Sequence, residues 1–545
     1  MIRRTLPLAG LALALTACAG VPQQQQAQQQ QAQQQAQQPA ALDLKYTTPA
    51  ASKGLDEIKW NLPYEPATLD AVRASNYAEN TALANQCESL LRMTPEMKSE
   101  PGLAEKADNP DPTTWVYTLR AGVKFWNGKE VTAEDVAASL NRNLVPENGT
   151  LWGAYYTHVD SIKATGPLQV TVKLKQPDVL FNQAMATPAG VVMEKAFLDA
   201  AGKDVGTAAK GVMCTGPFKL ESWKSGESMT LVRNEDYWGA KAKSAKLRFS
   251  FIADETTAVN ALRAGEVDGQ YFYLPPAAVG QLIDSPTGSV TLGQSLVFWA
   301  LLGAAKEGPY ADPRVREALS LALDRAAIAK VVLQNTSQPQ RAMVGPAYWT
   351  YAEDAFKQAY EALPAEKQDL ARAKQLLTEA GSPTEPITIA VQGSSSVHEQ
   401  TANLIKASGE ALGLKIELKV VPVDQYGNLY GADPKAREGI DAFFSTWYGN
   451  LPDPLDVYSV FTDGARTNFN GFQGVSADLA KARAEYDDQA RAGLITGIQE
   501  KVTQGVAWTP MTNLSVVLYM NDRITGAVPS FAFLYAPWAV ELGAK

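Results

Sequence analysis

The chain has 545 residues, 46% of them hydrophobic and 20% charged, which is the composition of an ordinary globular protein. This length predicts two or more packed lobes, because single domains rarely exceed about 250 residues. A formal net charge of -9 and the absence of any basic run argue against nucleic-acid binding. Beyond the first residues no apolar stretch reaches membrane length, so we expect the body of the chain to be soluble.

The amino-terminal residues predict export. Two arginines precede an apolar run over residues 6–15, which is shorter than the roughly 20 residues that a membrane-spanning helix needs. The run closes on Leu15-Thr16-Ala17-Cys18, which resembles a bacterial lipobox. We therefore expect a signal peptide over residues 1–17 and a lipid on Cys18. The alternative is a simple signal peptide cut near Ala19.

Residues 18–41 are predicted to form a tether that carries the lipidated cysteine. Between Pro22 and Pro39 the chain is almost entirely Gln with interspersed Ala. Such a tract cannot bury enough apolar surface to fold alone. We expect the folded part to begin near Leu42.

Two cysteines remain after Cys18, and they are Cys87 and Cys214. In an exported protein such a pair predicts a disulfide across the fold. Two buried thiols are the alternative, because the sequence gives no distance between them.

The order of expected elements predicts an α/β fold with mixed sheets flanked by helices. Thr132 is expected to cap a helix, with Asp135 at the spacing of a capping box. Ser225-Gly226 closes a predicted hairpin, and Gly381 ends a helix. The expected strands are 58–62, 115–119, 169–174, 215–223, 228–234, 247–252, 269–272, 295–302, 387–391, 415–421 and 441–446, and the expected helices are 81–91, 132–141, 256–264, 313–323, 370–380 and 399–412.

The stretch from residue 441 to 458 combines a strand with a turn. Its first half is an apolar run, and Trp447 and Tyr448 follow at the strand end. Gly, Asn and Pro residues then give a turn that carries Asn450 and Asp453. Aromatic faces and acceptors on a loop that a strand positions can grip a small molecule. The alternative is that Trp447 and Phe443 only pack in the core.

The sequence offers little support for an enzyme. His158 and His398 are its only histidines, and each is expected to be a surface or capping residue. There is no zinc-binding, Cys-x-x-Cys or nucleophile-turn motif and no phosphate-binding loop. We predict no cofactor and no metal held by the protein's own side chains. A secreted hydrolase, in which acids such as Asp453 and Asp456 form a catalytic pair, is the alternative from another class.

Short motifs that are weak singly follow one another in a specific order behind the lipobox. In this order the chain resembles the peptide/nickel (oligopeptide/dipeptide) class of ABC-transporter extracytoplasmic solute-binding lipoproteins. The motifs are Thr68-Leu69-Asp70, Pro101-Gly102-Leu103-Ala104-Glu105, Leu119-Arg120-Ala121-Gly122-Val123-Lys124-Phe125, Asn127-Gly128, Thr132-Ala133-Glu134-Asp135-Val136, Thr215-Gly216-Pro217-Phe218, Arg233-Asn234, Tyr237-Trp238-Gly239, Val315-Arg316-Glu317-Ala318-Leu319 and Leu323-Asp324-Arg325.

The resemblance implies a two-lobed fold like that of periplasmic binding proteins, of the large class with an extra subdomain. A ligand would close between the lobes and pass to the permease subunits of an ABC importer. The protein would be a monomer held at the outer face of the membrane by its lipid. The implied parts are 42–85, 200–295 and 510–545 for lobe I, 86–199 for the extra subdomain and 296–509 for lobe II, with chain crossings near 293–299 and 508–511.

The resemblance also implies where the ligand binds. Peptide-binding relatives have a Trp followed three residues later by an Asp, whose carboxylate holds the ligand's free amino terminus. Here the third residue after Trp447 is Asn450, which is neutral. This difference favours a modified peptide, a sugar-like or opine-like compound or a metal chelate over a standard free peptide. Asp453 or Asp456 could replace the missing carboxylate.

Other candidate contacts come from strand ends and loops. The expected ligand-binding residues are Trp447, Tyr448, Asn450, Asp453, Phe298, Trp299, Trp349 and Arg341. A patch formed by Trp152, Tyr155 and Tyr156 is expected mainly to pack. A surface receptor for signalling peptides would use the same fold, and the sequence cannot separate it from an uptake protein.

Overall fold

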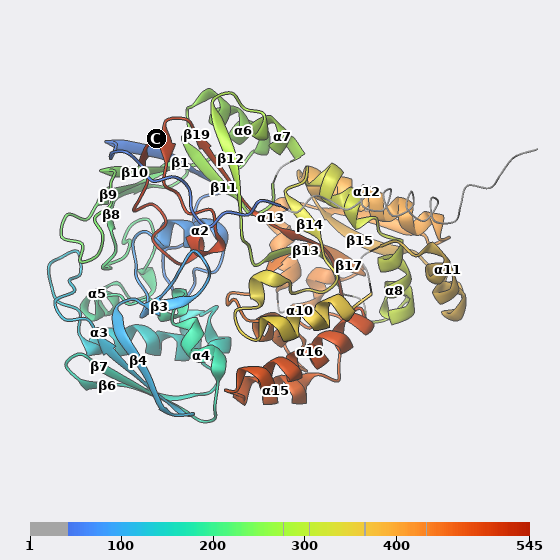
Figure 1. The fold of residues 1–545 in the computed structure, drawn as a ribbon, viewed down its shortest axis with the longest axis horizontal. Coiled ribbons are helices and arrows are strands. Elements are labelled where there is room, and N and C mark those ends of the chain that lie inside the picture. Colours follow the sequence, from blue (N-terminus) through green and yellow to red (C-terminus); the bar gives the residue numbers. More distant parts are fainter. Residues whose placement is uncertain (1–41, 276, 305, 365–366, 432) are drawn as a thin grey trace, which may run out of the picture. The chain divides into compact units, whose positions relative to one another are not determined.

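The structure is a computed structural model that describes residues 42–275, 277–304, 306–364, 367–431 and 433–545. The predicted signal peptide, Cys18 and the glutamine-rich tract therefore lie outside the described residues. The fold is of the α/β class with mixed sheets, as the sequence predicted (Figure 1). Among the described residues no helix is long and apolar enough to cross a membrane.

A seven-stranded mixed sheet is built from strands that are far apart in the sequence. Its order is β12-β19-β11-β1-β10-β9-β8, and β1 runs parallel to both β10 and β11. The apolar residues of β1 are fully buried, as expected for a central strand. The bounds are β1 Glu57–Leu62, β8 Phe218–Lys224, β9 Ser228–Arg233, β10 Lys246–Phe251, β11 Gly269–Phe272, β12 Gly288–Gly293 and β19 Val516–Asn521.

A four-stranded antiparallel sheet, in the order β4-β5-β7-β6, follows β1 along the chain. Thr132 caps the neighbouring helix α3 and forms the predicted capping box with Asp135. Cys87 and Cys214 form a disulfide whose Cα atoms lie 4.9 Å apart, and it joins this region to the segment before β8. The bounds are β2 Leu91–Met93, β3 Ser99–Pro101, β4 Ala104–Asp111, β5 Thr114–Leu119, β6 Val159–Gly166 and β7 Gln169–Leu174.

A six-stranded mixed sheet has the order β14-β18-β13-β17-β15-β16. The chain passes from β12 of the first sheet to β13 of this one at residues 294–296, and returns from β18 to β19 at Ser515. We call the part over residues 42–295 and 515–545 lobe I and the part over 296–514 lobe II. The bounds are β13 Val297–Gly303, β14 Ser337–Pro339, β15 Ile387–Gln392, β16 Ile416–Val421, β17 Ala442–Tyr448 and β18 Trp508–Leu514, and the pair β20 Ile524–Thr525 and β21 Gly543–Ala544 lies in lobe I.

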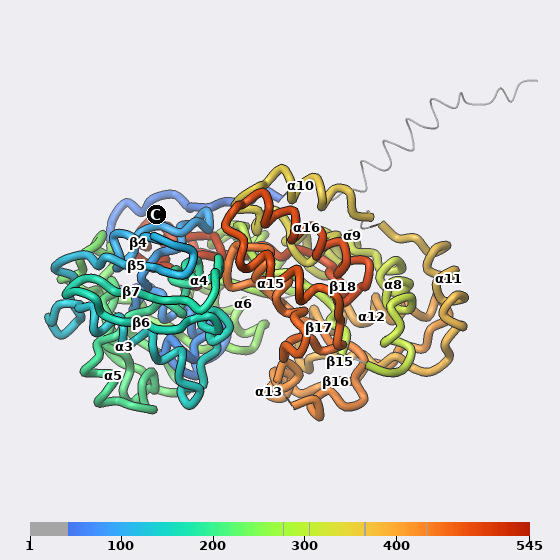
Figure 2. The backbone as a smooth tube through the Cα atoms, turned by 90° about the horizontal axis from the view of Figure 1, so that it is seen from below, coloured from blue at the N-terminus to red at the C-terminus, as the bar shows by residue number. Residues whose placement is uncertain are grey.

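Helices pack against each of these sheets, and α4 of lobe I contacts α15 of lobe II, which lie side by side in Figures 1 and 2. The bounds are α2 Tyr77–Leu83, α3 Ala133–Asn141, α4 Val179–Ala184, α5 Lys195–Ala201, α6 Glu255–Ala264, α7 Gly280–Ile283, α8 Pro313–Ala322, α9 Arg325–Ala327, α10 Glu353–Ala362, α11 Leu370–Glu379, α12 Ser396–Ala411, α13 Val423–Tyr426, α14 Pro454–Tyr458, α15 Ser476–Ala484 and α16 Asp488–Gln504.

Two local predictions were wrong. The helix expected over 81–91 is α2, which ends at Leu83, because the carbonyls of Asn85 and Gln86 accept hydrogen bonds from the backbone N–H groups of Phe218 and Gly216. His398 is neither a surface nor a capping residue, since it is 3% exposed and its Nδ1 accepts the backbone N–H of Gln392. Burial lowers the pKa of His398 to about 3, so its ring is neutral at physiological pH.

Candidate functional site

The two large sheets turn the carboxyl ends of their parallel strands toward the same region. β1, β10 and β11 are parallel in lobe I, and β15, β16 and β17 are parallel in lobe II. The helices that follow β10 and β15 meet there, because Ser396 Oγ donates a hydrogen bond of 3.2 Å to Glu255. In open α/β sheets, ligands bind beyond the carboxyl ends of the strands. This region between the lobes is therefore the candidate binding cleft.

Six half-buried aromatic residues gather at these strand ends, and we call them the aromatic cluster. Tyr77 stacks on Tyr273 at a centroid distance of 4.0 Å and lies 5.3 Å from the ring of Tyr448. Tyr448 Oη also donates a hydrogen bond of 2.6 Å to the carbonyl of Ser75, which joins lobe II to lobe I. The members are Tyr64, Tyr77 and Tyr273 of lobe I and Tyr430, Trp447 and Tyr448 of lobe II.

The cluster presents neutral hydroxyls. Burial and, to a smaller extent, the charge of the neighbouring Glu255 raise the pKa of Tyr273 to about 12. Burial likewise raises the pKa of Tyr430 to about 12. Ring faces and hydroxyls of this kind suit stacking and hydrogen bonding to a small molecule. The ring of Trp447 packs edge-on against the buried Trp508 at a centroid distance of 4.9 Å, and it is itself only half-buried.

Asn450 lies in a hydrogen-bond network between the lobes. Its Nδ2 donates to Tyr155 Oη over 3.2 Å, and its Oδ1 accepts from Tyr535 Oη over 3.0 Å. Tyr155 Oη in turn donates to Asp456 Oδ1 over 2.6 Å. The amide thus joins two tyrosines of lobe I, both of which are buried.

The number of protons in this network explains why position 450 carries an amide. A tyrosine hydroxyl has one proton, and that of Tyr155 goes to Asp456. The hydroxyl can only accept from position 450, and a carboxylate has no proton to donate. Asn450 supplies the donor for Tyr155 and keeps an acceptor for Tyr535.

Asp456 is the acid of this network. Burial raises the pKa of Asp456 to about 6, and the hydrogen bonds from Tyr155 and the backbone N–H of Leu451 limit the rise. At neutral pH the carboxylate is therefore mostly ionised and close to its titration range.

Asp453 is fully buried and acts within the protein. Its Oδ1 caps α14 by accepting the backbone N–H of Leu455, and it also accepts from Tyr351 Oη. Its Oδ2 accepts from Gln183 of lobe I over 3.0 Å. These bonds support a structural part for Asp453 and leave it no exposed surface for a ligand in this conformation.

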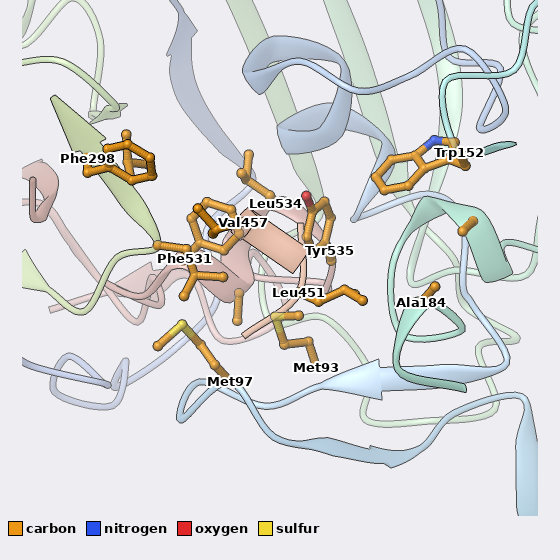
Figure 3. Close-up of a cluster of buried hydrophobic side chains, with 14 of the residues drawn as sticks. Met93, Met97, Trp152, Ala184, Phe298, Leu451, Val457, Phe531, Leu534 and Tyr535 are labelled. Carbon is orange, nitrogen blue, oxygen red and sulfur yellow. The ribbon is translucent and has the colours of Figure 1, made fainter. Parts of the chain in front are cut away.

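The remaining predicted contacts lie in the packed interior or beside α10. Phe298 and Trp299 of β13 are fully buried, and Trp299 stacks on Phe444. Figure 3 places Phe298 within a buried cluster that also contains Leu451, Val457, Phe531 and Tyr535. Trp349 is 9% exposed and packs edge-on against Tyr360, and the Arg341 guanidinium lies over the same ring. Trp152 is also core, since its indole N–H bonds to carbonyls of lobe I.

A second contact between the lobes lies beside α4. Asp178 Oδ2 and Arg483 Nη2 of α15 are 2.8 Å apart, and Arg483 also donates to the carbonyl of Ala154. Asp178 is fully buried and caps α4 through the N–H of Leu180, while His158 lies 3.2 Å away. This buried ion pair exists only while the two lobes are together.

The sequence reading missed most of the lobe I side of the cleft. Tyr64 and Tyr273 follow predicted strands by one or two residues, and Tyr77 begins α2. The signal that could have found Tyr64 and Tyr273 is their place directly after strands that proved to be parallel. Tyr155 belongs to the predicted patch with Trp152 and Tyr156, but only the fold brings it to Asn450.

The amino-acid sequence matches those of known proteins over most of its length. The family model described as bacterial extracellular solute-binding proteins, family 5 Middle, matches residues 98–469. The glutathione-binding protein GsiB of Salmonella typhimurium is 25% identical over 471 residues, which cover 84% of this chain and 89% of that protein. The dipeptide-binding protein DppE of Bacillus subtilis is 25% identical over 505 residues, covering 88% and 90% of the two chains.

Solved structures show the same fold. The periplasmic binding protein AgaA of A. tumefaciens R10, in complex with agropinic acid, has a TM-score of 0.76 and 24% identity, with 90% of this chain and 99% of that chain covered. The periplasmic binding protein DppA of Helicobacter pylori, in complex with the peptide STSA, has a TM-score of 0.78 and 22% identity, with 90% and 98% covered.

Proposed function

This chain belongs to the bacterial extracellular solute-binding proteins of family 5, and on that basis we propose that it captures one small solute between its lobes and delivers it to the permease of an ABC importer. The aromatic cluster supplies the contact surface. Tyr448 of lobe II contacts Tyr77 of lobe I, Tyr77 stacks on Tyr273, and Trp447 precedes Tyr448 on β17. The family binds solutes and is not catalytic, which supports a protein that releases its ligand unchanged.

We infer that the solute is not a peptide held by its amino end at position 450. The observation that carries this inference is the network of Asn450 with Tyr155 and Tyr535, which leaves no carboxylate there. A modified peptide, a sugar-like or opine-like compound or a metal chelate fits such a site. The fold alone does not distinguish between these classes of solute, because AgaA binds agropinic acid and DppA binds a peptide with the same fold.

The mechanism that we propose is closure of the lobes on the solute. Solute bound to one lobe gains contacts with the other only in the closed form, and these contacts shift the equilibrium toward it. The Tyr448 bond to Ser75, the Asn450 network and the Asp178–Arg483 pair stabilise the closed form. The two chain crossings at 294–296 and at Ser515 form the hinge.

We propose that a lipid on Cys18 holds the protein, as a monomer, at the outer face of the membrane. The Leu15-Thr16-Ala17-Cys18 motif supports this. Cys18→Ser should abolish incorporation of a radiolabelled fatty acid and release the protein from the membrane fraction. Unchanged labelling would contradict the lipid anchor.

Uptake is tested by deleting the gene and measuring import. Native mass spectrometry of the purified protein first identifies the bound solute, and cells that lack the protein should then fail to accumulate that compound. Restoration by wild-type protein but not by Trp447→Ala would tie uptake to the cleft. Normal accumulation in the deletion strain would contradict an import function.

A further inference from the structure

Two glutamates lie beside the aromatic cluster, and both belong to lobe I. Glu79 is in the first turn of α2, two residues after Tyr77, and is 4% exposed. Its carboxylate accepts the backbone N–H of Ala67 over 3.0 Å and Tyr64 Oη over 3.3 Å. Burial raises the pKa of Glu79, and the hydrogen bonds from the backbone and from Tyr64 limit the rise.

Glu255 stands at the other side of the cluster, in the first turn of α6. It is half-buried, and its carboxylate accepts a hydrogen bond from Ser396 of lobe II. Burial raises the pKa of Glu255, and the adjacent Asp254 adds to the rise. The charge of Glu255 adds to the raised pKa of Tyr273, so the carboxylate acts electrostatically on a member of the cluster.

Neither glutamate has a cationic partner in the part of the chain that the structure describes. The other buried acids of lobe I mostly do have one. Five of them form ion pairs with a lysine or an arginine: Asp70 with Arg73 and Arg142, Glu88 with Arg92, Asp178 with Arg483, Glu194 with Lys129 and Asp268 with Arg523. Buried charges in proteins are normally paired or hydrogen-bonded, so a buried acid without a cation beside the candidate cleft can take one from a ligand.

We propose that the aromatic cluster, with Glu79 and Glu255 beside it, is a subsite for a positively charged group of the solute. Tyrosine and tryptophan ring faces attract cations, and the two carboxylates add a negative field in a partly dehydrated cleft. A carboxylate of the solute would meet repulsion at the same place. The inference rests on the proposed function and names the charge class of its ligand. In this proposal the acids that pair with the positive group of the solute lie in lobe I, whereas the residue at position 450 of lobe II is neutral.

The test uses sets of small molecules in which the members share a carbon skeleton and differ in charge. Glucosamine, glucose and glucuronate form one set, and tyramine, tyrosol and 4-hydroxyphenylacetate form another. Binding to the purified protein is measured by calorimetry at pH 7. In at least one set the amine should bind about tenfold more tightly than the neutral member, the size of one or two cation–π contacts. The acid should bind more weakly than both.

Variants separate the charge effect from folding. Glu255→Gln should reduce the preference for the amine at least severalfold, because it removes the charge while the amide oxygen can still accept the hydrogen bond from Ser396. Glu79→Gln should do the same if it folds, although Glu79 also holds the backbone at Ala67. Glu417→Gln on β16, whose side chain pairs with Lys415 on the surface, is the control and should leave the preference unchanged.

Each other outcome overturns the subsite. An acid that binds most tightly, amines that do not bind at all, or an amine preference that Glu255→Gln leaves intact would each exclude it. A neutral or acidic solute found in the purified protein would exclude the subsite and leave the proposed capture of a solute standing. If no solute from any set or from growth extract binds, the proposed function fails as well.

Discussion

Asn450→Asp tests the proton count of the network between the lobes. In the variant, two carboxylates approach one hydroxyl, since Asn450 Nδ2 and Asp456 Oδ1 lie 3.2 and 2.6 Å from Tyr155 Oη. The two carboxylates would be at most about 6 Å apart, and at an effective dielectric constant of about 20 their repulsion is roughly 3 kcal/mol. Closing the lobes would incur this cost, whereas in the open form water screens both acids.

In the variant, protonating Asp456 costs less free energy than keeping both carboxylates ionised. With a pKa of about 6, protonating this acid at pH 7 costs about 1.4 kcal/mol. The protonated Asp456 then donates to Tyr155, and Tyr155 donates to the introduced carboxylate at position 450, so the network is complete again. We therefore expect a closure penalty of about 1 to 2 kcal/mol at pH 7, or about 5- to 30-fold in solute affinity. At pH 5 the penalty should nearly vanish.

The assay is calorimetric titration with the solute identified from the purified protein, at pH 7 and pH 5. Asn260→Asp, on the exposed face of α6, is the matched control for adding one negative charge. Affinity equal to wild type at both pH values would refute the proton count. A loss of the same size at both pH values would refute the part assigned to Asp456.

Three further predictions concern single side chains. Trp447→Ala should weaken solute binding at least about tenfold, to judge from typical effects of removing a central aromatic contact. It should lower the melting temperature of the free protein far less than Trp508→Ala, because Trp508 is only 2% exposed. Equal destabilisation by the two variants, with unchanged affinity in Trp447→Ala, would show that Trp447 is core. Because the pKa of Asp456 is raised in the folded protein, the folded form binds this proton more tightly than the unfolded chain does. The stability of wild type relative to Asp456→Asn should therefore fall as pH rises from about 4 to about 6. A difference in melting temperature that does not depend on pH would contradict this. Arg483→Met leaves Asp178 buried without its cation, which typically costs about 3 to 5 kcal/mol and should therefore favour the open form. Solution X-ray scattering should then show a larger radius of gyration than for the control Lys481→Met, which removes a surface pair. Identical scattering curves would argue against a stabilising contact between Asp178 and Arg483.

Elements with strong local signals were predictable from the sequence. The capping box of Thr132 and Asp135 marked the start of α3, and the apolar run marked β17, which extends two residues further than predicted, through Tyr448. β4 was missed because its residues are mostly polar and exposed and it contains Pro110, so no alternation marks it. His398 was misjudged because periodicity alone does not show which face of α12 is covered.

The site was predictable only on its lobe II side. Trp447, Tyr448 and Asn450 stand out because a strand and a turn present them within four residues. Tyr155 and Tyr535 lie about 300 and 85 positions from Asn450 in the chain, and only the packing of the lobes brings their hydroxyls to its amide. The same holds for the glutamates, because only the fold shows that neither has a cationic partner among the described residues.

The most direct test of the central claim is native mass spectrometry of the protein purified from its own organism, followed by denaturation and identification of what is released. We predict one compound, or a narrow set of compounds, that is not a series of unmodified peptides. Peptides of varied sequence with free amino termini would contradict the account, because Asn450 is committed to Tyr155 and Tyr535 and Asp453 is fully buried.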